Sequence, residues 1–328
     1  MIKKISLKNK YFEKIIIIII IIFNLYFIIN AYSNNNLSFK KFDIHFKYHN
    51  YQREMITEKM KQYSSWQLGR IEPYFINGII RKYKPKKCLE VGVANGGSSI
   101  VILNAIKDIQ NSFLISLDLN TMLYYNSKKK TGYNVYKYFP ELTKNWKLYT
   151  GDQPHKFLDK LNLKFDFLFL DTAHFSPGEL INIIEVLPFL EENAIIVLHD
   201  IMYHLISRNS FRPKEIKCHP SNILLMTSLY GDKVIIERDD KQIANIGAIR
   251  LYPNQKKYYL NYFLLLLTPW EYLPSEDHIR DIREFIKKYY KKEIYLNLFN
   301  KSIEENKIYI HKFKEFYNSS HPIFDKYK

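Results

Sequence analysis

A short apolar run that breaks into glycines and resumes as a helical pattern constrains the fold more than any other feature. The run covers residues 87–91, the glycines fall within residues 92–97, and the helical pattern covers residues 98–109. This order predicts a buried parallel strand, a tight turn and a helix start. Glycines let such a turn approach a ligand, and the first N–H groups of a helix lack partners within it. We therefore expect a ligand at this turn.

The residues of the turn favour S-adenosylmethionine over a dinucleotide. The pattern is Glu90-x-Gly92-x-x-x-Gly96, and Ala94 stands where a dinucleotide-binding turn has its second glycine. That glycine lets the backbone approach a pyrophosphate, so its replacement weakens the case for NAD. Glu90 would repel phosphates but would accept a hydrogen bond from an ammonium group. S-adenosylmethionine has an ammonium group and no phosphate.

The stretch Leu89-Glu90-Val91-Gly92, with Gly96 and Ser98, resembles the first motif of class I S-adenosylmethionine-dependent methyltransferases. The most similar branch is the small-molecule O-methyltransferases, including sugar and antibiotic tailoring enzymes related to cephalosporin hydroxylase-like proteins. The resemblance covers residues 70–252. It implies a ribose-binding acid at the end of the second strand and adenine contacts after the third. The cofactor-binding residues expected in this way are Glu90, Gly92, Ala94, Gly96, Ser98, Asp118, Gly151, Asp152 and Gln153.

Further apolar runs alternate with helical patterns, which predicts an α/β fold. Residues 233–237 and 243–251 are β-rich around a polar turn and predict an antiparallel hairpin at a sheet edge. We expect a Rossmann-like, doubly wound, mostly parallel sheet with this edge hairpin, an N-terminal hydrophobic segment and a C-terminal helical extension. Strands are predicted at residues 87–91, 113–118, 146–152, 165–171 and 194–200, with helices at 98–109, 154–161 and from 176 to 190.

The last of these helices carries a start signal. Ser176 is expected as its N-cap, Pro177 as its first helical residue and Glu179 as the partner three residues after the cap.

Two predicted strands end in an acid with a histidine nearby. Asp171 is followed by His174, and His199 directly precedes Asp200. Because open α/β sheets bind ligands at the carboxyl ends of their strands, we expect Asp171 and Asp200 to converge there. Either histidine could take a proton from an acceptor hydroxyl near neutral pH. For His199, a hydrogen bond that caps the strand is an equally good interpretation.

The resemblance extends to catechol O-methyltransferase-like enzymes, which hold Mg²⁺ at the matching strand ends. Asp171 and Asp200 occupy those places, which makes them candidate metal ligands. Such enzymes carry an Asn where this chain has Ile201, and a lysine where it has His174. The histidine base is therefore favoured over a metal, although two carboxylates and a histidine could still bind Mg²⁺ or Mn²⁺.

The chain divides into four segments by composition and pattern. The third contains an insertion or lid at residues 120–145, and the second contains helices at residues 52–63 and 71–83. The segments are a basic and hydrophobic anchor or signal segment at 1–32, a linker with N-terminal helices at 33–84, the methyltransferase domain at 85–252 and a helical extension at 253–328.

The first segment predicts attachment to a membrane. Residues 15–29 are uncharged and Ile-rich, and five lysines precede them. A span needs about 20 residues, so a signal peptide, a signal anchor and an interfacial anchor all remain open. A span with its N-terminus inside would place the domain outside the cytoplasm, away from S-adenosylmethionine. We expect a membrane-associated protein with a cytoplasmic catalytic domain and leave the topology open.

Charge and the motifs together decide among the remaining function classes. The net charge is +16, but residues 85–252 hold 20 basic against 18 acidic residues, so no nucleic-acid partner is expected. The favoured function is O-methylation of a small-molecule or glycan hydroxyl. An NAD-dependent oxidoreductase or epimerase is disfavoured by Ala94. A membrane-tethered, non-catalytic binding module is disfavoured by acids at four separate strand ends, which are Glu90, Asp118, Asp171 and Asp200.

Overall fold

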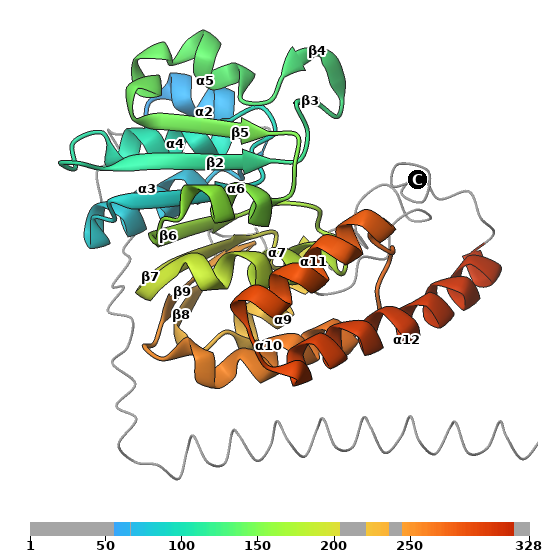
Figure 1. Ribbon diagram of the computed structural model, residues 1–328. Helices are drawn as coiled ribbons and strands as arrows, with labels where there is room; N and C mark the ends of the chain where they lie inside the picture. Colours follow the sequence, from blue (N-terminus) through green and yellow to red (C-terminus); the bar gives the residue numbers. More distant parts are fainter. Residues whose placement is uncertain (1–55, 66, 204–220, 236–244, 318–328) are drawn as a thin grey trace, which may run out of the picture. The chain divides into compact units, whose positions relative to one another are not determined.

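A seven-stranded sheet forms the centre of the part of the chain that the structure describes (Figure 1). The computed structural model describes residues 56–65, 67–203, 221–235 and 245–317. The strand order is β5-β2-β1-β6-β7-β9-β8. The first five are parallel, and β9 runs antiparallel to both β7 and β8. The strands are β1 (Lys87–Val91), β2 (Phe113–Asp118), β5 (Trp146–Thr150), β6 (Phe165–Leu170), β7 (Leu190–His199), β8 (Gly231–Ile235) and β9 (Ile246–Leu251).

This topology confirms the fold expected from the sequence, including the antiparallel hairpin at the edge. The apolar runs lie inside because parallel strands with helices on both faces have no solvated side. The register aligns the strand ends: Val91 pairs with Leu117 on one side and Leu170 on the other, and Leu170 pairs with Leu198. The residues that follow these positions therefore reach one edge of the sheet together.

Helices cover both faces of the sheet. The face that carries Leu89 and Leu168 packs against α6, α7 and the C-terminal helices in one hydrophobic core. The face that carries Glu90 packs against α4. The helices are α2 (Glu58–Ser64), α3 (Glu72–Tyr83), α4 (Gly97–Ile106), α5 (Tyr133–Tyr138), α6 (Pro154–Leu161), α7 (Gly178–Val186), α9 (Ser221–Ser228), α10 (Tyr259–Leu264), α11 (Glu276–Tyr289) and α12 (Glu293–Tyr317), with 3₁₀ helices η2 (Pro140–Asn145), η3 (Leu187–Phe189), η4 (Gln255–Tyr258) and η5 (Leu265–Leu267).

The helix start predicted at Ser176 is wrong. Helix α7 begins at Gly178, and Pro177 precedes it as an N-cap without a side-chain hydrogen bond. The backbone N–H of Ser176 donates instead to the carboxylate of Glu271 (2.7 Å), and Glu179 accepts from the backbone N–H of His174 (3.1 Å). A partner 95 residues away along the chain has taken the place of the local capping box.

The insertion at residues 120–145 folds into small elements of its own. It contains a two-stranded hairpin of β3 (Met122–Leu123) and β4 (Asn126–Lys130), followed by α5 and η2. In Figure 1 this hairpin stands next to the arrowheads of β2 and β5, where those strands end. The insertion therefore lies at the edge that the sequence predicts to bind ligands.

The C-terminal extension shares the core of the sheet. Trp270, Phe263 and Phe299 are fully buried and belong to the same hydrophobic cluster as Leu170 and Leu198. The boundary drawn at residue 252 therefore does not separate two cores.

No helix in the described ranges is long and apolar enough to cross a bilayer. The anchor predicted at residues 1–32 lies outside those ranges, so it stays a prediction.

Replacement of Trp270 tests how much the extension contributes to stability. Its side chain has no exposed surface, and its indole N–H donates to the carbonyl of Leu266 (2.8 Å). Trp270→Ala should lower the free energy of unfolding by about 3–5 kcal/mol, because a large cavity opens in the shared core. Urea denaturation of the full chain measures this loss. Leu264→Ala, at a site that is 39% exposed, is the control and should stay within about 0.5 kcal/mol of wild type.

Candidate active site

The glycine at the end of β1 is required by the neighbouring strand. Gly92 has a φ of +91°, and an added Cβ would lie 2.6 Å from the carbonyl carbon of Asp171, which directly follows β6. The backbone N–H of Asp171 also donates to the carbonyl of Val91 (3.0 Å). The sequence suggested that Gly92 makes room for a cofactor. In the structure, the missing side chain of Gly92 makes room for the backbone of Asp171. The hydrogen bond from Asp171 to Val91 holds that backbone beside the turn.

Several backbone N–H groups of the turn have partners within the protein. Those of Val93 and Ala94 donate to one carboxylate oxygen of Asp118 at 2.9 and 3.0 Å. That of Gly97 donates to the side-chain oxygen of Gln67 (2.6 Å). Asp118 thus holds the turn against the end of β2 by two charge-assisted hydrogen bonds.

The carboxylate of Glu90 is enclosed by serines. It accepts hydrogen bonds from the hydroxyls of Ser98 (2.6 Å), Ser99 (2.7 Å) and Ser116 (2.5 Å), and the residue has no exposed surface. Burial raises the pKa of Glu90 to about 7, although the three hydroxyls act in the opposite direction. These hydrogen bonds mean that Glu90 and Ser98 tie β1 to α4. The contact expected from Glu90 to a ligand ammonium group stays a prediction.

The insertion packs directly on the turn. The backbone N–H of Gly132 donates to the carbonyl of Ala94 (2.8 Å), and that of Asn134 donates to the carbonyl of Asn95 (2.9 Å). A Cβ at Gly96 would lie 2.7 Å from a methyl carbon of Val135. The insertion thus packs against the turn, at the edge of the sheet where the candidate site lies.

The residues expected to bind ribose and adenine lie side by side at the ends of β2 and β5. Asp118 pairs with Thr150 in the sheet, and the backbone N–H of Gly151 donates to the carbonyl of Asp118 (3.0 Å). Asp152 follows at once, and Gln153 is the residue before α6. Gly151 has a φ of +94° and is exposed, and an added Cβ there would lie 3.2 Å from a methyl carbon of Thr121. These residues thus lie together at the edge where the cofactor is expected.

The structure brings Asp171, His174, His199 and Asp200 together, as the sequence predicts for the two acids. His174 Nε2 lies 3.0 Å from a carboxylate oxygen of Asp200 and 3.7 Å from one of Asp171. His199 Nδ1 lies 3.3 Å from the same oxygen of Asp171 and 3.6 Å from that of Asp200. Each acid thus faces both rings, although the four residues come from the ends of two strands and the loop between them.

Two glutamates complete this cluster, and the sequence analysis missed both. Glu179 lies 3.3 Å from His174 Nδ1, and Glu72, from the start of α3, lies 2.8 Å from His199 Nε2. Glu179 was assigned to a helix cap, and Glu72 lies 127 residues from its partner. No local pattern relates residues at that separation.

The environment of Asp200 differs from the metal-binding pattern that the resemblance implies. Ile201 stands where catechol O-methyltransferase-like enzymes carry an Asn, and it is buried in the hydrophobic core. Asn245, just before β9, donates through its side-chain amide to Asp200, and its side-chain oxygen accepts from the backbone N–H of Met202 (3.1 Å). Asn245 thus orients Asp200, and its own side-chain oxygen is occupied by the hydrogen bond from Met202.

The carboxylates keep both histidines protonated at neutral pH. Burial alone would lower the pKa of His174, but Asp200, Glu179 and Asp171 raise it to about 9. Burial would also lower the pKa of His199, but the carboxylates of Asp171, Asp200 and Glu72 raise it well above its usual value. The pKa of Asp200 lies well below its usual range, because the two histidines outweigh its burial. Four carboxyl groups thus surround the two imidazole rings.

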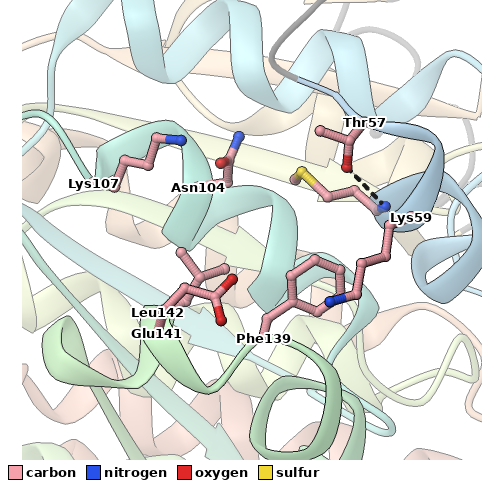
Figure 2. A pocket seen from close by; sticks show the side chains of 8 residues that line it. Thr57, Lys59, Asn104, Lys107, Phe139, Glu141 and Leu142 are labelled. Carbon is pink, nitrogen blue, oxygen red and sulfur yellow. Dashed lines mark hydrogen bonds between the residues drawn. The ribbon is translucent and has the colours of Figure 1, made fainter.

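A cavity of about 290 Å³ lies elsewhere, between the start of α2, the end of α4 and η2 (Figure 2). Its lining includes Lys59, Asn104, Lys107 and Glu141. Asn104 and Lys107 are at the end of α4 opposite to the glycine turn, so this cavity is separate from the cluster of acids and histidines.

The raised pKa of His174 makes stability depend on pH. A histidine whose folded pKa is about 9, against about 6.5 in the unfolded chain, stabilises the fold fully below pH 6.5 and loses this effect as the pH rises through 9. Urea denaturation should therefore show a free energy of unfolding that falls between pH 6.5 and 9. His174→Gln should reduce this slope, and exchange of the exposed His311 to Gln should not. An unchanged slope in His174→Gln would contradict the assigned ion pairs.

Comparison with known protein families adds to this geometry. The sequence model of the family described as "Methyltransferase domain" matches residues 89–201. The match includes the glycine turn, Asp118 and the cluster from Asp171 to Asp200, and it ends before the C-terminal extension. A comparison with curated proteins finds no match.

Solved structures give distant likenesses. An O-methyltransferase from Bacillus cereus in complex with S-adenosylhomocysteine is 12% identical, with a TM-score of 0.44 over 61% of this chain and 92% of its own. A methyltransferase from Podospora anserina bound to S-adenosylhomocysteine is 17% identical, with a TM-score of 0.42 over 60% and 88% of the two chains. The O-methyltransferase TomG from Streptomyces achromogenes, involved in tomaymycin synthesis and solved with S-adenosylmethionine, is 12% identical, with a TM-score of 0.43 over 61% and 91%.

Proposed function

We propose that this chain transfers a methyl group from S-adenosylmethionine to a hydroxyl of a small molecule or glycan, and the match of residues 89–201 to a methyltransferase domain supports this proposal. The observation that carries this proposal is the meeting of His174 with Asp171 and Asp200 at one edge of the sheet. An O-methyltransferase must align its two substrates and remove a proton from the acceptor. A histidine between two acids, beside the expected cofactor site, supplies the means for both.

We place the cofactor at the ends of β2 and β5. S-adenosylmethionine supplies an electrophilic methyl group on a positively charged sulfur. The weakest of the bonds to Asp118, from the side-chain amide of Asn120 (3.4 Å), is the one that a ribose hydroxyl would replace. Gly151 offers bare backbone for the adenine ring, and Asp152 and Gln153 border it. The carboxylate of Asp200, whose pKa is lowered, favours a cationic sulfur at this edge.

His174 is the residue that we assign to the acceptor's proton. Its Nε2 is held between the two acids, and its Nδ1 faces Glu179 at 3.3 Å. With a pKa of about 9, neutral His174 is a stronger base than an ordinary histidine but is a minor form at pH 7. The surrounding carboxylates then stabilise the imidazolium that forms when the acceptor loses its proton.

A divalent cation also fits this cluster. The ligand atoms of Asp171, His174 and Asp200 lie within 4.8 Å of one another, and the buried His199 Nδ1 has no well-formed hydrogen bond. These residues would hold the ion, which would lower the pKa of an acceptor hydroxyl bound to it. Two oxygens and a nitrogen favour Mn²⁺ over Mg²⁺, which prefers oxygen ligands alone.

Tyrosines around the edge indicate a ring-containing acceptor. Tyr124 and Tyr125, in the β3–β4 hairpin, are 61% and 45% exposed. The pKa of Tyr124 is raised mainly by burial, then by Tyr125, and also by the nearby Asp171. The ring of Tyr203 lies 4.9 Å from that of His174. Aromatic faces near a base can stack on a phenol or pack on the face of a sugar. An NAD-dependent reaction and a non-catalytic binding module are both less consistent with this cluster and the family match.

The pH dependence of turnover tests the base. We expect methyl transfer from labelled S-adenosylmethionine to a panel of hydroxylated acceptors to rise with pH up to about 9, because the neutral form of His174 grows. His174→Gln should lose about 10²- to 10⁴-fold in rate. Binding of S-adenosylhomocysteine, measured by calorimetry, should stay nearly unchanged in this variant.

Two controls separate the outcomes. His311→Gln should keep both the rate and its pH profile, since His311 is an exposed residue of α12 and does not belong to the cluster around His174. Activity that survives EDTA would exclude the metal, and activity restored only by Mn²⁺ would establish it. A wild-type rate in His174→Gln would refute the base.

The N-terminal segment remains a prediction from the sequence, and we propose that it directs the chain to a membrane. A chain that starts at residue 33 should bind S-adenosylhomocysteine with unchanged affinity, because every residue assigned to the cofactor lies after residue 89. The full chain should sediment with membranes, and the shortened chain should not. Equal distribution of the two would refute the anchor.

A further inference from the structure

A second group of histidines and an acid lies outside the candidate active site. It consists of His155 at the start of α6, Glu185 near the end of α7 and His278 in the first turn of α11. One carboxylate oxygen of Glu185 lies 2.6 Å from His155 Nδ1 and 3.4 Å from His278 Nε2. The two imidazole rings are nearly parallel, with centres 6.3 Å apart. Two nitrogens thus converge on one oxygen from opposite helices.

This group is almost fully enclosed. Glu185 has no exposed surface, and the side chains of His155 and His278 are 8% and 15% exposed. Burial alone would raise the pKa of Glu185, but the hydrogen bonds from the two histidines lower it to about 2. A buried carboxylate that stays ionised needs a cation or strong donors beside it.

A further residue orients the acid. Asn182, one turn earlier on α7, donates to the second carboxylate oxygen of Glu185 (3.0 Å) and accepts from the hydroxyl of Thr172 (2.9 Å). The first oxygen is therefore left to face the two histidines. Metal sites in proteins commonly hold their carboxylate ligands in this way.

We propose that His155 Nδ1, Glu185 Oε1 and His278 Nε2 bind a divalent transition metal, with Zn²⁺ as the ion that fits best. The three atoms lie within 4.8 Å of one another. Ligands about 2.0 Å from a tetrahedral Zn²⁺ lie about 3.3 Å apart. The distance between His278 and Glu185 already matches, and that between His155 and Glu185 needs to open by about 0.7 Å.

The choice of ion follows from the ligands. Two imidazoles and one carboxylate suit Zn²⁺, whereas Mg²⁺ and Ca²⁺ favour oxygen. Water would complete the tetrahedron, since three protein ligands leave one position open. Because His278 belongs to the C-terminal extension and Glu185 to the matched domain, the ion would join the two segments. This site is independent of the proposed methyl transfer.

Metal titration of the purified full chain tests the proposal. Zn²⁺ binding should be seen by calorimetry and by a rise in melting temperature, and Co²⁺ in its place should give the visible absorption of a tetrahedral site. His278→Ala should weaken this binding by more than about 100-fold, beyond the 10- to 100-fold loss that is typical for a residue that only orients a ligand. Asn182→Ala should fall within that smaller range.

Two further variants make the result decisive. His174→Gln disrupts the cluster at the candidate active site and should leave this Zn²⁺ binding and the Co²⁺ spectrum in place. His278→Gln keeps much of the side-chain volume, and circular dichroism of both His278 variants shows whether the fold persists. Failure of wild type to bind Zn²⁺ stoichiometrically, or equal binding by folded His278→Ala, would overturn the proposal and leave a buried ion pair.

Discussion

The close approach of Gly92 to the backbone of Asp171 is the contact on which the candidate site depends. It joins the ends of the neighbouring strands β1 and β6 at a distance that no side chain allows. The turn after β1 then lies beside Asp118 on one side and Asp171 on the other. The residues proposed for the cofactor and for the acceptor are thereby held next to each other by backbone contacts, which position side chains more rigidly than flexible loops do.

The strands and the meeting of Asp171 with Asp200 could be predicted from the sequence because both follow from short-range patterns. Buried parallel strands are nearly continuous apolar runs, and their carboxyl ends must share one edge. The predicted strand at residues 113–118 has the observed bounds, and the edge hairpin lies where its two β-rich runs suggested. In these cases a local signal and the topology of the sheet agree.

The failures concern side chains whose partners are distant in the chain. The sequence analysis missed that the hydroxyls of Ser98, Ser99 and Ser116 surround the carboxylate of Glu90. Ser176 has the pattern of a helix cap, but Glu271 takes its backbone N–H. Tertiary contacts of this kind compete with local preferences and leave no periodic trace. The same reason hides the pairing of His155 with His278, which are brought together only by the packing of α11 on α6.

The shared core of the sheet and the C-terminal helices has a consequence for how this chain can change during evolution. Domains that have separate cores can be exchanged or lost one at a time, because each keeps its own stability. Here Trp270 and Phe299 fill the same apolar layer as the strand residues Leu170 and Leu198. Loss of the extension would expose that layer to water. The sheet and the extension therefore cannot be separated without loss of stability, and a substitution on either side of the layer changes the packing of the other.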